Sequence, residues 1–220
     1  LAQGTTGRFH GLLHSGGRYV VSDPGSATEC AEENAILRRI QADAIEDTGG
    51  LFVTLADDDP GFADKFLAGA AATGVPATEI PVAEALRREP RLDPRIKSAI
   101  AVADGSVDGW QLVWGAARSA DAHGAKILTY HRVVKIERDG DRVASVLCRD
   151  EKGGEDVRID CTFVLNCAGP WAGQISAMAG ADPVAVVPGR GIMIAMNHRL
   201  VNTVINRCVH PTDGDILVPI

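Results

Sequence analysis

Helix and strand signals alternate along this chain of 220 residues, and the alternation restricts the fold more than any other feature of the sequence. Asp23-Pro24 and Asp59-Pro60 each place a carboxylate before a proline, a pairing that favours the start of a helix. Short apolar runs at 51–55 and 99–102 are typical of strands. Interleaved elements of this kind predict an α/β (mixed α+β) fold with mixed sheets.

Residues that typically start or end helices and strands predict where the individual elements lie. The expected helices are 24–44, 57–74, 82–90, 108–124 and one that begins near Trp171. Turns at Asp139-Gly140 and Gly153-Gly154 predict a three-stranded β-meander. The other expected strands are 51–55, 77–80, 99–102, 163–167, 184–187, 192–196, 203–206 and 215–219, the last of which ends with the chain.

Composition excludes several classes of protein. A net charge of −7 disfavours nucleic acid or an anionic membrane as the main partner. No apolar run approaches the roughly 20 residues of a membrane-spanning helix. The cysteines are odd in number and without CxxC spacing, which favours structural thiols in a reducing cytosol over a disulfide scaffold or zinc site. They are Cys30, Cys148, Cys161, Cys167 and Cys208.

Acidic residues are missing from two stretches of the chain. Residues 1–22 hold two arginines and two histidines, and residues 183–212 hold three arginines and two histidines, with no Asp or Glu in either. Two acid-free basic stretches near opposite ends of the sequence predict one anionic ligand site assembled by folding. The alternative is that glycine-rich loops and strands simply lack acids.

Two motifs carry the chemical information. "TTGRFHGLLHSGGRYV" (5–20) combines glycines with basic and titratable groups. "TFVLNCAGPWA" (162–172) reads as a buried strand that ends in small residues before a helix, where backbone approaches a ligand and free N–H groups attract an anion.

Together, "TTGRFHGLLHSGGRY" (5–19), "VLNCAGPWA" (164–172) and "PGRG" (188–191) resemble the FAD-dependent glycerol-3-phosphate dehydrogenases, within the amino-acid-oxidase-like flavoprotein superfamily. The phrases "ECAEENAILRRI", "GLFVTL", "VADGSVD", "VINRC" and "DILVP" agree, and are most similar to the large catalytic subunit of the anaerobic, quinone-linked type. The resemblance covers essentially the whole chain. It implies oxidation of sn-glycerol 3-phosphate to dihydroxyacetone phosphate, with electrons passed from FAD to a quinone.

The resemblance also implies roles for individual residues. His14 is the candidate general base, because an unperturbed imidazole titrates near neutrality, and His10 is the competing candidate. Either histidine could instead only hydrogen-bond the flavin or backbone. Arg18, Tyr19, Arg190 and Arg207 are the candidate phosphate ligands, in that order for the arginines, and a surface salt bridge is the alternative for Arg18. The expected FAD contacts are Thr5, Thr6, Arg8, Gly11, Val134, Ala168, Gly169 and Trp171.

The family's glycine fingerprint, G-x-G-x-x-G, does not occur in this sequence. We therefore expect an internal fragment that lacks the first βαβ unit of a Rossmann-like FAD-binding domain and that is inactive and poor in FAD by itself. Residues 1–50 and 105–182 would belong to the FAD-binding domain, and 51–104 and 183–220 to a mixed or antiparallel-sheet substrate domain.

The resemblance further implies a cytoplasmic enzyme at the inner face of the cell membrane. It would have no transmembrane segment and no metal, would reach the quinone through partner subunits, and would form a homo- or hetero-oligomer. Two alternatives remain: an FAD enzyme for another small 2-hydroxy acid or amine, and a non-catalytic structural fragment.

Overall fold

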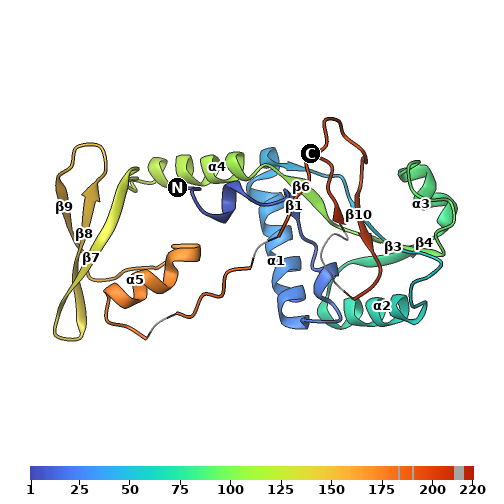
Figure 1. The fold of residues 1–220 in the computed structure, drawn as a ribbon, viewed down its shortest axis with the longest axis horizontal. Helices are drawn as coiled ribbons and strands as arrows, with labels where there is room; N and C mark the ends of the chain where they lie inside the picture. Colours follow the sequence, from blue (N-terminus) through green and yellow to red (C-terminus); the bar gives the residue numbers. More distant parts are fainter. Residues whose placement is uncertain (183, 190, 211–215) are drawn as a thin grey trace. The chain divides into compact units, whose positions relative to one another are not determined.

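The computed structural model describes residues 1–182, 184–189, 191–210 and 216–220, and these fall into two units (Figure 1). The first unit contains residues 1–8 and 116–190, and the second contains 9–115 and 191–220. These boundaries differ from those of the predicted domains, since 9–50 and 105–115 join the second unit and 183–190 joins the first. The assignment of cofactor and substrate binding to separate domains stays a prediction.

Five strands form the main sheet of the second unit, in the order β11-β10-β3-β5-β4. They are β3 (Gly50–Thr54), β4 (Ala77–Ile80), β5 (Ser98–Val102), β10 (Val204–Arg207) and β11 (Ile216–Leu217). β10 runs parallel to β3, and the remaining neighbours in this sheet are antiparallel. The predicted mixed sheet is therefore present.

Helices cover both faces of this sheet. α1 (Pro24–Ile40) and α2 (Gly61–Thr73) supply small and aromatic side chains to one core, in which the rings of Phe52 and Phe66 lie 4.6 Å apart. α3 (Val82–Arg88) packs on the other face through Ala85. Because side chains alternate along a strand, Phe52 faces the first core while its neighbours in β3 face the second.

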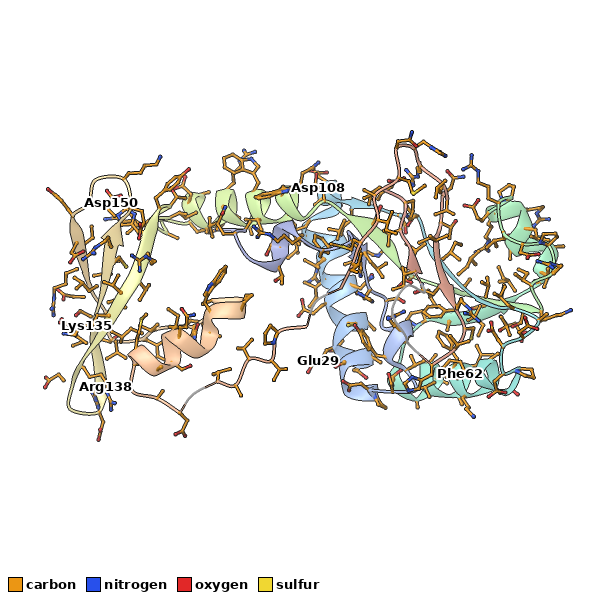
Figure 2. The ribbon with its side chains drawn as sticks, viewed as in Figure 1. Glu29, Phe62, Asp108, Lys135, Arg138 and Asp150 are labelled. Atoms are coloured by element: carbon orange, nitrogen blue, oxygen red, sulfur yellow. The ribbon has the colours of Figure 1, made fainter. Side chains whose placement is uncertain are left out.

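Capping residues set several helix ends at or near the predicted positions. Asp23 accepts a hydrogen bond from the Ser26 backbone N–H at the start of α1, and α2 stops at Gly74, which has a φ of +72°. α1 ends at Ile40 rather than at residue 44, because 42–44 form a 3-10 turn. Asp108, labelled in Figure 2, caps α4 (Gly109–Ala122).

A small antiparallel sheet fixes the glycine-rich loop of the second unit. Its strands, in the order β1-β6-β2, are β1 (Leu12–Leu13), β6 (Gly105–Val107) and β2 (Ile45–Glu46). The backbone N–H of Val107 also donates to the Gly11 carbonyl at 2.7 Å. The loop is thus hydrogen-bonded to β6.

The first unit contains the predicted β-meander. Its strands are β7 (His131–Asp139), β8 (Arg142–Asp150) and β9 (Asp156–Asp160), paired antiparallel in that order. α5 (Ala172–Met178) follows the predicted start at Trp171 and contacts β7. Figure 2 labels Lys135 and Arg138 on β7 and Asp150 at the end of β8.

Three predicted strands, 163–167, 184–187 and 192–196, are not strands in this structure. Phe163 and Leu165 each keep 78% of their surface exposed, and Ile194 keeps 82%. An apolar run becomes a strand only where a neighbour pairs with its backbone, and the described residues provide no such ladder here. The predictions of strands at these three segments, and of burial at 163–167, are therefore wrong.

In the described part of the chain, no helix combines the length and the apolar character needed to cross a membrane.

Candidate functional site

The loop that contains both candidate histidines has a constrained backbone. Gly11 and Gly16 have φ values of +76° and +97°, in the region that favours glycine. Between them, Leu12 and Leu13 are buried in β1, which anchors the segment. Gly16 precedes a 3-10 turn at Gly17–Tyr19, so the loop reverses and carries Arg18 back towards the histidines.

Three ring side chains of this loop form a continuous cluster. The His14 ring centroid lies 5.8 Å from that of His10 and 5.6 Å from that of Tyr19. The His10 Nδ1 atom accepts the Leu12 backbone N–H at 3.1 Å, so the neutral His10 ring carries its proton on Nε2. Tyr19 also packs against the core beneath α1 and α2. The structure therefore brings His10, His14 and Tyr19 together.

Burial and positive charge keep these histidines neutral. Burial is the largest cause that lowers the pKa of His14, to about 4, and the neighbouring His10 and Arg18 lower it further. The pKa of His10 is also lowered, first by burial and then by Arg18. Burial raises the pKa of Tyr19. Near pH 7 the cluster thus combines a cationic guanidinium with two neutral imidazoles.

Arg207 does not join this cluster. Along β10 it alternates with Asn206, so its side chain leaves the strand on the face opposite to Asn206, where Ile205 packs in the second core. Its guanidinium forms an ion pair with Asp58, whose side chain is only 2% exposed. Pairing of Arg207 with Asp58 argues against the predicted convergence of Arg18 and Arg207 on one phosphate. Arg190 lies outside the described residues.

Buried polar residues under the loop were missed by the sequence analysis. Asp104 accepts the Ser15 backbone N–H at 2.8 Å, and Asn34 donates to the His14 carbonyl at 3.0 Å. From the sequence, "VADGSVD" indicates only a strand and turn, and Asn34 only part of a helix. A polar residue on the core-facing side of α1 was the available signal, since a buried amide needs hydrogen-bonding partners.

In the first unit, two segments predicted to contact FAD lie against each other. A Cβ placed on Gly4 would meet the Trp171 ring at 3.1 Å and the Pro170 ring at 3.4 Å. The 3-10 turn Thr5–Gly7 follows Gly4 immediately, and the rings that Gly4 approaches belong to the 3-10 turn Gly169–Trp171. These residues are more than 160 positions apart in the sequence.

The Gly169–Trp171 turn has an accessible backbone, which a dinucleotide could approach closely. Gly169 has a φ of +55°, and a Cβ placed there meets no described atom within 4 Å. No charged residue occurs in 161–181, so no carboxylate there repels a pyrophosphate. The Arg8 guanidinium instead donates to the carbonyls of Gln3 and Gly4 and braces the loop. These residues fit a dinucleotide cofactor.

Val134 occupies an irregular position in the meander. The pairing of β7 with β8 shifts register between Val133 and Lys135, and Val134 stands in this bulge. A bulge takes a residue out of the regular ladder and exposes its backbone to other partners. The position is compatible with the predicted backbone contact to adenine.

The family model described as FAD dependent oxidoreductase matches residues 1–220, the whole chain. This chain belongs to the FAD-dependent oxidoreductase family. The resemblance inferred from the motifs is therefore confirmed, as is FAD as the cofactor of the family.

Curated relatives in this FAD-dependent oxidoreductase family include two anaerobic enzymes. The chain is 46% identical to the A1 subunit of the anaerobic glycerol-3-phosphate dehydrogenase of Haloferax volcanii, matching all of this chain and 39% of that protein. It is 42% identical to the A subunit of the Escherichia coli enzyme of the same name, matching all of this chain and 40% of that protein. The chain thus spans about 40% of the length of these relatives.

Solved structures of FAD-dependent oxidoreductases share the fold. Glycine oxidase from Geobacillus kaustophilus matches all of this chain and 59% of its own, with a TM-score of 0.69 and 20% identity. The L-α-glycerophosphate oxidase of Mycoplasma pneumoniae, solved with FAD bound, matches 94% of this chain and 56% of its own, with a TM-score of 0.69 and 17% identity. The predicted mixed α/β fold class is confirmed.

Proposed function

We propose that the full-length protein oxidises sn-glycerol 3-phosphate to dihydroxyacetone phosphate with FAD as its cofactor. The observation that carries the proposal is the cluster of His14, His10, Arg18 and Tyr19 on one loop. Relatives up to 46% identical, named as components of glycerol-3-phosphate dehydrogenases, support the choice of substrate.

Arg18 binds the phosphate group in this proposal. A guanidinium is permanently charged and offers a two-pronged donor that matches phosphate oxygens. The Tyr19 hydroxyl, whose raised pKa keeps it protonated, adds a neutral donor beside it. Arg190 stays a candidate from the sequence for a second cation, which a doubly charged group favours over a carboxylate.

His14 accepts the proton of the substrate's C2 hydroxyl. It is the more buried of the two histidines and is neutral near pH 7. Because Arg18 is one cause of its low pKa, a phosphate dianion on Arg18 would offset that repulsion and raise the basicity of His14. Substrate binding would thereby bring the pKa of the base closer to the working pH, where general-base catalysis is most effective. His10, with its proton held on Nε2, acts as a hydrogen-bond donor in the same cluster.

Thr5, Thr6, Ala168, Gly169 and Trp171 would hold the dinucleotide, with Val134 against the adenine and Gly11 close to the flavin ring. Bound FAD supplies the acceptor for the hydride that leaves C2 of the substrate. Loss of a proton to His14 and of a hydride from carbon together convert the alcohol to a ketone.

Electron transfer beyond FAD is also part of the proposal. The two anaerobic relatives are named as single components, A1 and A, of larger enzymes, which supports partner subunits that carry electrons onward. We propose a quinone as the final acceptor and a cytoplasmic enzyme, peripheral at the inner face of the membrane, in glycerol metabolism.

A substrate panel on the purified full-length protein tests the proposal. Anaerobic flavin reduction is followed with sn-glycerol 3-phosphate, glycerol, glycolate, glycine and proline. We expect reduction by sn-glycerol 3-phosphate at a kcat/KM at least about 100-fold above that of any other member, because only it offers the phosphate. Faster reduction by a 2-hydroxy acid or an amine would contradict the proposal.

A further inference from the structure

We propose that Asp104 and Asn34 are positioning residues. They hold His14 in place through hydrogen bonds to the peptide bond between His14 and Ser15. The inference rests on the proposed role of His14 and adds two residues to which neither the motifs nor the relatives assign a function.

Both polar groups of one peptide bond are held by buried side chains. The carbonyl of His14 accepts a hydrogen bond from Asn34 Nδ2 at 3.0 Å, and the adjoining N–H of Ser15 donates to Asp104 Oδ1 at 2.8 Å. Asn34, Ser15 and Asp104 are 4%, 1% and 3% exposed. Water therefore does not compete for these bonds, and the plane of this peptide is fixed from two sides.

Arg38 in turn fixes both Asn34 and Asp104 through hydrogen bonds. Arg38 donates through Nε to Asn34 Oδ1 at 2.7 Å, and through Nη2 to the carbonyls of Ala103 and Asp104 at 3.0 and 3.1 Å. Asn34 Nδ2 also donates to the Ala103 carbonyl at 3.2 Å. α1 and the β5–β6 turn are thus joined directly under the loop.

The Asp104 side chain fits because its neighbour at the start of β3 is Gly50, which has no side chain. A Cβ on Gly50 would lie 2.6 Å from Asp104 Cβ and 2.7 Å from its Oδ2, so glycine at the start of β3 admits the carboxylate. The same Oδ2 atom accepts a hydrogen bond from Asn206 Nδ2 at 3.3 Å, while Asn206 Oδ1 is buried without a partner among the described residues. The carboxylate therefore links the loop to β10 as well.

This arrangement matters because it ties the His14 backbone to residues that lie outside its own loop. The His14 ring is flanked by His10 and Tyr19, which belong to the same loop. Rotation of the peptide after His14 would change the position of its imidazole, and small misplacements of a catalytic group slow the reaction strongly. Asp104 acts as an acceptor here, so an isosteric amide can replace it if its oxygen faces Ser15.

The test compares four variants of the full-length protein, Asp104→Ala, Asp104→Asn, His14→Gln and the double variant Asp104→Ala/His14→Gln. Glu89→Ala is the matched control, because Glu89 is another buried carboxylate that accepts backbone N–H groups, at Asn202 and Arg91, away from the loop. Two quantities are measured: hydrogen exchange of the peptide that contains Ser15, and the rate of flavin reduction per bound FAD.

We expect Asp104→Ala to speed exchange at Ser15 by at least about tenfold and to slow flavin reduction by about 100-fold. Asp104→Asn should keep most of the wild-type exchange protection at Ser15 and most of the flavin-reduction rate. Glu89→Ala should change neither quantity. In the His14→Gln background, Asp104→Ala should slow flavin reduction no further, since it acts through His14.

A slow His14→Gln variant together with an Asp104→Ala variant that keeps the wild-type rate would overturn this inference alone. The inference would also be overturned if the rate of flavin reduction in the double variant fell by the product of the two single-variant losses. A wild-type rate in His14→Gln would instead overturn the proposed base, and with it the catalytic part of the inference.

Discussion

The imidazole of His14 lies 5.6 Å from the phenol ring of Tyr19, centroid to centroid, and Arg18 is the residue that precedes Tyr19. A neutral proton acceptor and a permanent cation are thus carried by one short loop. The loop can hold this arrangement because Gly16 reverses the chain and β1 anchors it. One segment can therefore both bind an anion and accept a proton beside it.

The pKa of His14 should respond to an anion on Arg18. We expect sulfate, which stays a dianion across the titration, to raise the His14 pKa above its value of about 4 relative to chloride at equal ionic strength. Arg18→Gln should raise the pKa by itself and abolish the sulfate effect. Carbon-13 NMR of labelled histidine measures both, and an equal sulfate response in the two proteins would refute the coupling.

The same low pKa makes stability depend on pH. Between pH 6.5 and 4 the unfolded state binds a proton at His14 that the folded state does not, so the free energy of unfolding falls as the pH falls through this window. His14→Gln should remove at most about 3 kcal/mol of this acid sensitivity. Urea unfolding of both proteins at pH 7 and pH 4.5 measures the difference, and identical pH dependence would count against a buried, neutral His14.

Arg18 and Arg207 should behave differently when neutralised. Arg18→Gln is expected to raise the KM for sn-glycerol 3-phosphate by at least about tenfold, since a charged hydrogen-bond donor to phosphate is lost. Arg207→Gln should leave KM unchanged and lower stability by about 1–3 kcal/mol, because Asp58 loses its cation in a buried setting. Steady-state kinetics and urea unfolding separate the two. A raised KM in Arg207→Gln alone would reverse the assignment.

Gly16 should tolerate no side chain. Its φ is +97°, and a Cβ there would lie 2.3 Å from the Ala27 carbonyl oxygen, so Gly16→Ala must displace either the loop or α1. We expect a loss of more than about 2 kcal/mol of stability and slower flavin reduction. Gly74→Ala is the control, because it also has a positive φ but open space around it, and should cost only about 1 kcal/mol. Equal losses would show that the contact with Ala27 is unimportant.

FAD retention should depend on the contact between Gly4 and Trp171. Gly4→Val would push the Trp171 ring away from the Thr5–Gly7 turn. The expected result is a lower ratio of FAD to protein after gel filtration, with the secondary structure retained by circular dichroism. Gly25→Ala, whose new methyl would lie 3.6 Å from Asp23, should keep the wild-type ratio. Full retention in Gly4→Val would argue against a cofactor contact at this turn.

Local sequence signals predicted the helices and the meander, because caps and short turns are formed by residues close together in the sequence. Asp23, Gly74 and Asp108 each cap a helix through groups no more than four residues away. The segment 163–167 shows the limit of such signals. Its apolar pattern indicates burial but does not identify the strand that would pair with it.

The site was predictable in part for the same reason. His10, His14, Arg18 and Tyr19 are close in sequence, and the reversal at Gly16 keeps them close in space. Asp104 and Asn34 reach the loop only through tertiary folding, and the face of β10 from which Arg207 projects depends on register. A single sequence does not identify the partners in long-range contacts of this kind, even where a buried polar residue such as Asn34 indicates that a partner is needed.

Single-turnover flavin reduction by sn-glycerol 3-phosphate in His14→Gln tests the central claim most directly. The exposed His123 supplies the control variant, His123→Gln. We predict that the reduction rate of His14→Gln falls by at least about 100-fold, as expected for loss of a general base, while substrate affinity stays within about threefold. A reduction rate in His14→Gln equal to that of the wild type and of His123→Gln would contradict the account.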